Sequence, residues 1–344
     1  MTQISRYFDM RRFQALAAVA AIVALTGAAE PLGSALRSAA ATYYAKAGQV
    51  AIVAGRDTTM DYYDRLLDDA ALLNESAPKN YPAQLWQQTI QVAAQLDLSL
   101  ATQLLHRSYQ PMAAIRGLGE TLVRSSKDGT MQPVAIYVPS QYSASTPAPL
   151  VVFLHGLQQT ESHLVAAQYL RDLADATGTI IVAPYGRGAY DFRGAESDVY
   201  DAFDAANRAF RIDPRRRYLV GYSMGGYSLF RLAPIHSADW SAVMSIAGSL
   251  LVSREPLVTT TMRDTRFYIL TGARDQTVPT SYLIAAAIYL RDAGLPVTFY
   301  SQFNGTHELY SLRQIISQAC NDMEHGVVRY PVGLTGASNL PEDL

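Results

Sequence analysis

The sequence predicts an α/β fold, in which a mostly parallel sheet is flanked by helices and preceded by a helical segment. Two observations predict this fold. From residue 150 onward, short runs that are apolar throughout alternate with segments of helical periodicity. Strands without polar positions are typical of parallel sheets that helices cover on both faces. Residues 36–106, in contrast, show only helical periodicity.

The composition indicates a globular protein and excludes several function classes. The chain has 344 residues, of which 49% are hydrophobic and 17% are charged, as in ordinary folded domains. Its net charge of −2 lacks the basic surplus that nucleic-acid binding uses. Cys320 is the only cysteine, which excludes an internal disulfide, and no Cys/His zinc spacing occurs. We therefore expect no metal and no organic cofactor.

The first thirty residues resemble an export signal. Arg6, Arg11 and Arg12 precede the uncharged apolar run 13–29, which ends in small residues. A basic flank, an apolar run and a small-residue site are typical of secretory signal peptides. The run is shorter than the roughly 20 residues that span a bilayer comfortably. We expect a periplasmic or secreted protein, in which residues 1–30 are either a cleaved signal peptide or an uncleaved membrane anchor. A purely soluble amphipathic helix is the alternative to export.

Helical periodicity continues after this leader. The expected helices cover 36–53, 58–74 and 83–106, with Pro78 and Pro82 between the last two. The simplest interpretation of residues 31–115 is a helical layer that packs on the following part of the chain. A lid over a site and an oligomerisation surface are the alternatives.

Short β-like runs and helical segments alternate from residue 134 onward. The expected strands are 134–138, 150–154, 179–183, 217–220, 241–246, 266–270 and 297–300, and the expected helices are 161–177, 197–210, 224–236, 280–293 and 309–318. In such sheets ligands bind beyond the carboxyl ends of the strands. Functional side chains are therefore expected in the loops that follow the strands.

A candidate nucleophile, Ser223, lies at one of these strand ends. It is the central residue of the sequence G-Y-S-M-G, between an expected strand and an expected helix. A serine on such a sharp turn has a strained backbone, and the neighbouring glycines allow the strand and the helix to approach closely. The turn exposes the hydroxyl at a helix N-terminus, where developing negative charge is favoured.

Chain order selects the partners of this serine. His236 lies 13 residues on, at the far end of the helix that Ser223 begins, about 20 Å away at 1.5 Å per residue. His307, in contrast, follows the strand 297–300, and Asp275 follows the strand 266–270. We expect His307 to act as the base and Asp275 to orient it, because a serine nucleophile needs both. A structural histidine and a simple turn aspartate are the alternatives.

An oxyanion formed at this serine needs two backbone N–H donors. Met224 follows the nucleophile directly and supplies the first. The loop after the strand 150–154 supplies the second, at Leu157 or, failing that, at Gln158. His155 in the same loop is expected to brace it.

These motifs resemble the α/β-hydrolase superfamily. The resemblance rests on L-V-V-F-L-H-G, on I-D-P-R-R-R-Y-L-V-G-Y-S-M-G-G, on G-A-R-D-Q-T-V-P and on G-T-H, and covers roughly residues 116–318. Within the superfamily the chain looks most similar to secreted esterases of the polyhydroxybutyrate depolymerase and feruloyl esterase type, and to predicted peptidases of that group. The resemblance implies an α/β-hydrolase catalytic part over residues 116–344, and the N-terminal helices depart from it.

The expected function is therefore hydrolysis of carboxylic esters, of small or polymeric substrates, through an acyl-enzyme. A serine peptidase of the prolyl-oligopeptidase type and an acyltransferase are the enzymatic alternatives, and a binding protein on a hydrolase scaffold is the alternative from another class. The loop 185–198 follows a strand, so Tyr185, Tyr190 and Phe192 are candidate substrate-binding residues.

Overall fold

The computed structural model describes residues 29–54, 56–330, 333–334 and 340–341. The expected leader, residues 1–30, therefore lies outside the described residues except for its last two positions, which begin the first described helix. Among the residues described, no helix combines the length and the apolar character that crossing a bilayer requires.

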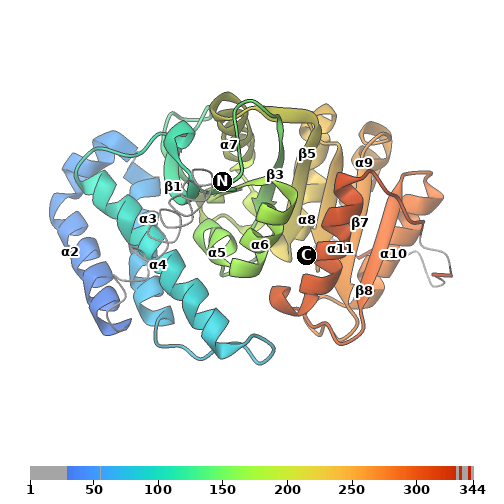
Figure 1. Ribbon diagram of the computed structural model, residues 1–344, viewed down its shortest axis with the longest axis horizontal. Helices are drawn as coiled ribbons and strands as arrows, with labels where there is room; N and C mark the ends of the chain where they lie inside the picture. Colours follow the sequence, from blue (N-terminus) through green and yellow to red (C-terminus); the bar gives the residue numbers. More distant parts are fainter. Residues whose placement is uncertain (1–28, 55, 331–332, 335–339, 342–344) are drawn as a thin grey trace, which may run out of the picture.

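An eight-stranded sheet forms the centre of the molecule (Figure 1), and its order is β1-β2-β4-β3-β5-β6-β7-β8. The strands are β1 (Gly117–Arg124), β2 (Met131–Val138), β3 (Ala148–Leu154), β4 (Ile180–Pro184), β5 (Ile212–Tyr222), β6 (Ala242–Ile246), β7 (Arg266–Gly272) and β8 (Val297–Gln302). β2 runs antiparallel to β1 and to β4, and every other pair is parallel. The expectation of a mostly parallel sheet is confirmed, although β1 was not predicted.

The register of the central strands aligns their carboxyl ends. Leu154 on β3 pairs with Gly221 on β5, which pairs in turn with Ser245 on β6. Ser245 pairs with Ile269 on β7, and Ile269 with Phe299 on β8. The loops that leave these strands therefore emerge at one edge of the sheet, where the sequence places the candidate site residues.

Seven α-helices accompany the sheet in the part of the chain that is described. They are α5 (Glu161–Ala166), α6 (Gln168–Thr177), α7 (Glu196–Ala209), α8 (Met224–Leu232), α9 (Glu255–Thr261), α10 (Thr280–Asp292) and α11 (Arg313–Glu324). The single helix expected over 161–177 is broken at Ala167, whose backbone is extended. The helix expected over 224–236 ends at Leu232 and continues as a 3₁₀ turn, because Pro234 has no N–H to donate to the helix.

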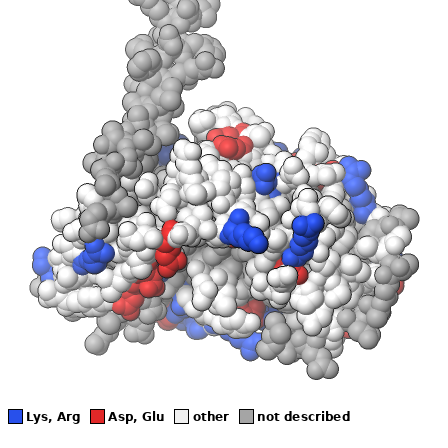
Figure 2. Space-filling model, turned by 90° about the horizontal axis from the view of Figure 1, so that it is seen from below, with Lys and Arg blue, Asp and Glu red and all other residues white. Residues whose placement is uncertain are grey.

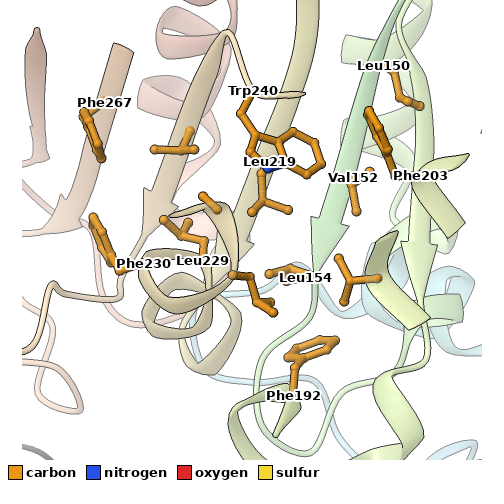
Figure 3. Close-up of a cluster of buried hydrophobic side chains, with 14 of the residues drawn as sticks. Leu150, Val152, Leu154, Phe192, Phe203, Leu219, Leu229, Phe230, Trp240 and Phe267 are labelled. Atoms are coloured by element: carbon orange, nitrogen blue, oxygen red, sulfur yellow. The ribbon is translucent and has the colours of Figure 1, made fainter. Parts of the chain in front are cut away.

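Each face of the sheet buries its own apolar cluster, because successive strand residues point to opposite faces. Val152 and Leu154 pack on the face covered by α7, α8 and α10, whereas Val151 and Phe153 pack on the face covered by α5, α6 and α11. Figure 3 shows part of the first cluster, in which Phe230 of α8 lies near Phe267 of β7. This packing fixes α8, and with it the residue that precedes it, against the sheet.

Three further helices lie beside the β1 end of the sheet (Figure 1). They are α2 (Ala29–Ala54), α3 (Arg56–Leu72) and α4 (Ala83–Leu105). Their apolar side chains form a third cluster, which also contains Leu122 of β1 and Met131 of β2. The helices therefore pack on the sheet as well as on one another. On the face drawn in Figure 2, acidic and basic side chains are scattered among uncharged ones, as a net charge of −2 suggests.

Candidate active site

Ser223 occupies the turn between β5 and α8 in a strained conformation. Its backbone angles are φ 51° and ψ −115°, a combination that non-glycine residues rarely adopt. Glycines make this turn sterically feasible. A Cβ added at Gly221 would lie 2.1 Å from the carbonyl oxygen of Gly225, and one added at Gly225 would lie 2.3 Å from that of Leu154. The pattern G-x-S-x-G therefore follows from the close approach of α8 to β3 and β5.

Three loops bring Ser223, His307 and Asp275 together. The Oγ of Ser223 lies 2.8 Å from Nε2 of His307, and Nδ1 of His307 lies 2.8 Å from Oδ2 of Asp275. With the ring proton on Nδ1, His307 donates to Asp275 and its Nε2 accepts the hydroxyl proton of Ser223. In the sequence, His307 lies 84 residues after Ser223 and 32 residues after Asp275.

The carboxylate of Asp275 is fixed independently of the histidine. Its side chain is fully buried, and its Oδ1 accepts hydrogen bonds from the backbone N–H groups of Thr277 and Val278, at 2.8 and 2.9 Å. Its Oδ2 is thereby aimed at the imidazole. A buried carboxylate with hydrogen bonds to both oxygens can stabilise a positive charge on the adjacent ring.

Tyr222 holds the other side of His307, a contact that no sequence pattern signalled. Its hydroxyl donates to the backbone carbonyl of His307 at 2.7 Å, and the two rings have centroids 5.5 Å apart. Burial raises the pKa of Tyr222, so the hydroxyl stays protonated and remains a donor. Successive side chains of a strand point to opposite faces of the sheet. The side chain of Tyr222 therefore points to the face from which the loop that carries His307 approaches.

The loop after β3 lies next to this turn. His155 is buried, with Nδ1 2.9 Å from the carbonyl oxygen of Gly156 and Nε2 3.1 Å from that of Tyr185, so it braces the loop as expected. Leu157 has an exposed side chain, and Gln158 has a φ of 60°. Met224 is the first residue of α8, where backbone N–H groups lack intrahelical acceptors.

The candidate substrate-binding residues divide into two groups. Phe192 is fully buried in the core, where its ring packs against His155, with centroids 5.0 Å apart. Tyr185 is also buried, beneath the guanidinium of Arg65. Both predictions are corrected, because side chains at these positions support the loops rather than face the solvent. Tyr190 is 54% exposed and lines a pocket together with Met224.

A buried charged cluster adjoins the same loops and was not predicted. Arg65 of α3 donates to Glu161, the first residue of α5, at 2.7 Å, and to Asp97 of α4 at 3.0 Å. Glu120 of β1 lies 3.1 Å from the hydroxyl of Tyr62. Burial raises the pKa of Glu120 and of Glu161. Among the residues described, no group of His, Cys, Asp or Glu side chains is suited to hold a metal ion.

The remaining histidines after Ser223 lie elsewhere. His236 follows α8, and its ring packs on Tyr200 with centroids 4.3 Å apart. His325 caps the end of α11, where Nδ1 lies 2.8 Å from the carbonyl oxygen of Asn321. Neither is hydrogen-bonded to Ser223, in agreement with the expectation from chain order.

Comparison with known proteins relates the chain to esterases. The family model described as "Putative esterase" matches residues 125–268, which include Ser223 but not Asp275 or His307. The bifunctional acetylxylan esterase/xylanase XynS20E of Neocallimastix patriciarum is 30% identical over 105 residues. That match covers 29% of this chain and 15% of the relative, so the chain spans only a small part of the relative's length.

Solved structures share the fold. A ferulic acid esterase matches 60% of this chain and 97% of its own, with a TM-score of 0.52 and 16% identity. A thermostable esterase matches 62% of this chain and 63% of its own, with a TM-score of 0.51 and 18% identity. At these identities the likeness concerns the fold, which is the one that the motif resemblance implied.

Proposed function

We propose that this chain, which shares its fold with solved esterases and matches an esterase family model over residues 125–268, hydrolyses carboxylic esters with Ser223, His307 and Asp275 as its catalytic triad. The observation that carries the proposal is the unbroken chain of two 2.8 Å hydrogen bonds from Ser223 through His307 to Asp275. The strained turn at Ser223, at the N-terminus of α8, supports the same role.

The mechanism follows from these contacts. His307 takes the proton of Ser223 at Nε2 while Oγ attacks the ester carbonyl, and Asp275 stabilises the imidazolium that forms. The N–H groups of Met224 and Leu157 are the proposed donors to the oxyanion. His307 then returns the proton to the leaving alcohol, which yields an acyl-enzyme at Ser223. Water, activated by the same histidine, releases the acid.

A labelling experiment tests the nucleophile. A fluorophosphonate probe is expected to label the wild-type protein and to leave Ser223→Ala unlabelled, while the two proteins show the same circular dichroism. His307→Ala is expected to lose labelling, and His236→Ala, the matched control, to keep it. Equal labelling of wild type and Ser223→Ala would refute the assignment, and an inert wild-type protein would favour a binding role.

Substrate class is tested by a panel of 4-nitrophenyl esters and peptide amides assayed side by side. The esterase relatives favour turnover of the esters alone. Faster cleavage of amides would identify a peptidase of the prolyl-oligopeptidase type instead. Product analysis with added alcohols distinguishes hydrolysis from acyl transfer, since an acyltransferase would form new esters in preference to the free acid.

We also propose that residues 13–29 direct export. The support is the sequence alone: a charged flank with three arginines followed by an apolar run and small residues. Cell fractionation of the full chain should place it outside the cytoplasm, and N-terminal sequencing of the recovered protein distinguishes a cleaved signal from an anchor. Cytoplasmic recovery of an intact chain would contradict the proposal.

A further inference from the structure

The loop between α3 and α4, residues 73–82, reaches the loop that carries His307. The side-chain amide of Asn80 donates to Oγ1 of Thr306 over 3.1 Å, and Thr306 precedes His307 directly. The two bonded residues are 226 positions apart in the chain. This hydrogen bond therefore joins the N-terminal helices to the segment that holds the candidate base.

An aromatic contact joins the same two loops beyond His307 in the sequence. Tyr81 is buried, and its ring centroid lies 4.8 Å from that of Tyr310. Tyr310 also packs edge-on against Tyr169 of α6, with centroids 5.4 Å apart. Aromatic pairs of this kind contribute more than their burial alone. The candidate base thus lies between one residue that contacts Asn80 and another that contacts Tyr81.

The loop between α3 and α4 is itself firmly held. Pro78 and Pro82 fix the backbone φ angle at two of its positions. The N–H of Tyr81 donates to the carbonyl oxygen of Pro78 at 2.9 Å, and the Tyr81 hydroxyl lies 3.2 Å from Oγ1 of Thr89 on α4. Trp86, in the first turn of α4, packs against the ring of Tyr81 with centroids 5.6 Å apart. The loop therefore presents its side chains from a fixed position.

The backbone beside His307 is also bonded to the loop that bears Asp275. The carbonyl oxygen of Gly305 accepts a hydrogen bond from the N–H of Arg274, which precedes the aspartate, at 2.8 Å. A shift of this segment would change both 2.8 Å hydrogen bonds of the imidazole. Misplacement of a catalytic group by about 1 Å can slow a reaction about 100-fold, so contacts that fix this segment bear on the rate.

We propose that Asn80 and Tyr81 are positioning residues, which hold His307 in line between Ser223 and Asp275. They act through the residues that they contact rather than on the ester itself. The N-terminal helices thereby contribute to the catalytic geometry as well as to the stability of the sheet. The inference rests on the proposed function, because it concerns the same triad.

Substitutions of Tyr81 test the proposal, with 4-nitrophenyl acetate as the substrate. Tyr81→Leu removes the ring, and we expect kcat to fall about 10-fold while KM stays within about 2-fold, because alignment of the base affects the transition state more than binding. Tyr81→Phe keeps the ring and should stay within about 2-fold of wild type in kcat. The rate of fluorophosphonate labelling should fall with kcat, since it uses the same serine and histidine.

Tyr63→Leu is the matched control for a general loss of stability. Tyr63 is a buried tyrosine of α3 whose ring stacks on Tyr43, with centroids 3.7 Å apart. The same change of residue type in the same helices should lower the urea unfolding midpoint but leave kcat and the labelling rate of the folded protein unchanged. An equal loss of kcat in Tyr63→Leu and Tyr81→Leu would overturn the positioning role.

Asn80→Ala tests the second contact in a residue that is exposed, so the variant should fold even if Tyr81→Leu does not. We expect kcat to fall about 3-fold, as the loss of one neutral hydrogen bond allows. Lys79→Ala removes the neighbouring exposed side chain of the same loop and should leave kcat unchanged.

The outcomes separate this proposal from the proposed function. Turnover that requires Ser223 but keeps its wild-type kcat in both Tyr81→Leu and Asn80→Ala would overturn the positioning role and leave esterase function intact. Losses that appear in KM alone would overturn it as well. A wild-type protein that neither turns over the ester nor reacts with the fluorophosphonate would overturn both.

Discussion

The guanidinium of Arg65, on α3, donates to the carboxylate of Glu161, the first residue of α5, over 2.7 Å. The same guanidinium lies 4.7 Å from the ring centroid of Tyr185. Tyr185 follows β4, and its carbonyl oxygen faces the ring of His155. One side chain of the N-terminal helices therefore contacts the end of the loop after β3 and the start of the loop after β4. This arrangement indicates that the helices support the site as well as cover the sheet.

Arg65→Met tests this support. The substitution keeps much of the side-chain volume but leaves two carboxyl groups, Glu161 and Asp97, buried without their cation. Removing one partner of a buried ion pair typically costs about 3–5 kcal/mol. We expect a loss of stability of that order in urea unfolding, and a lower kcat for the protein that remains folded. Arg65→Lys keeps the charge, so its free energy of unfolding should fall less. A loss of less than about 1 kcal/mol in the free energy of unfolding of Arg65→Met would contradict the supporting role of Arg65.

Glu120 gives a prediction about the pH dependence of stability. Burial, followed by the nearby carboxyls of Asp97 and Glu161, raises the pKa of Glu120 well above its usual range. Below the unfolded-state pKa of about 4.3, Glu120 is protonated in both states and pH has no effect through it. Above that value the unfolded chain releases the proton and the folded protein keeps it. Stability then falls by up to about 1.4 kcal/mol per pH unit until the folded pKa is passed.

Glu120→Gln isolates this contribution, since an amide resembles the protonated acid and can still bond to Tyr62. We expect the free energy of unfolding of Glu120→Gln, measured in urea between pH 5 and 8, to increase relative to that of wild type as pH rises. Asp69 and His163 are present in both proteins, so their own titrations largely cancel in the comparison, whereas Glu161 interacts with Glu120 and contributes to the difference. A difference that stays constant with pH would mean that Glu120 is ionised in the folded protein.

The positions of the candidate catalytic residues could be predicted from the sequence because the ends of the strands determine them. Ser223, Asp275 and His307 each follow a parallel strand, so the sheet alone brings them to one edge, and the structure places them in hydrogen-bond contact. Arg65 and Glu161 are 96 residues apart on separate helices, and no local pattern signals such a contact. Phe192 and Tyr190 are both aromatic and lie in the same loop, but only the fold determines which of them is buried.

Asp275→Asn tests whether Asp275 orients the ring of His307 or only stabilises its own loop. The amide oxygen can still accept from the N–H groups of Thr277 and Val278, so the loop should keep its conformation. Its NH₂ group would face Nδ1 of His307 and favour the wrong tautomer. In a serine–histidine–aspartate triad this change lowers kcat by roughly 10⁴-fold. Steady-state kinetics with unchanged unfolding midpoints would confirm the role, and a loss below about 10-fold would point to a turn aspartate.

Gly221→Ala tests the close packing at the nucleophile turn. The new Cβ would lie 2.1 Å from a backbone oxygen of α8, which cannot move without displacing the helix. We expect a loss of about 3 kcal/mol or more, or failure to fold. Gly33→Ala in α2 is the matched control, because the nearest atoms to its Cβ lie 3.5 Å away on a flexible arginine. There an alanine should stabilise the helix by about 0.5–1 kcal/mol, and equal effects at both sites would refute the crowding argument.

Removal of residues 1–106 tests how far the sheet depends on the helices. The truncated chain would lose Arg65, and it would uncover Leu122 and Met131, which the helices now bury. We expect aggregation, or at best an unstable protein, because an exposed apolar face of several hundred Å² promotes association. Light scattering after size-exclusion chromatography measures this outcome. Removal of residues 1–28 alone is the control and should leave a soluble, active protein, because all three helices stay in place. If the chain without residues 1–106 were instead monomeric and fully active, α2, α3 and α4 would be an independent appendage rather than a support of the site.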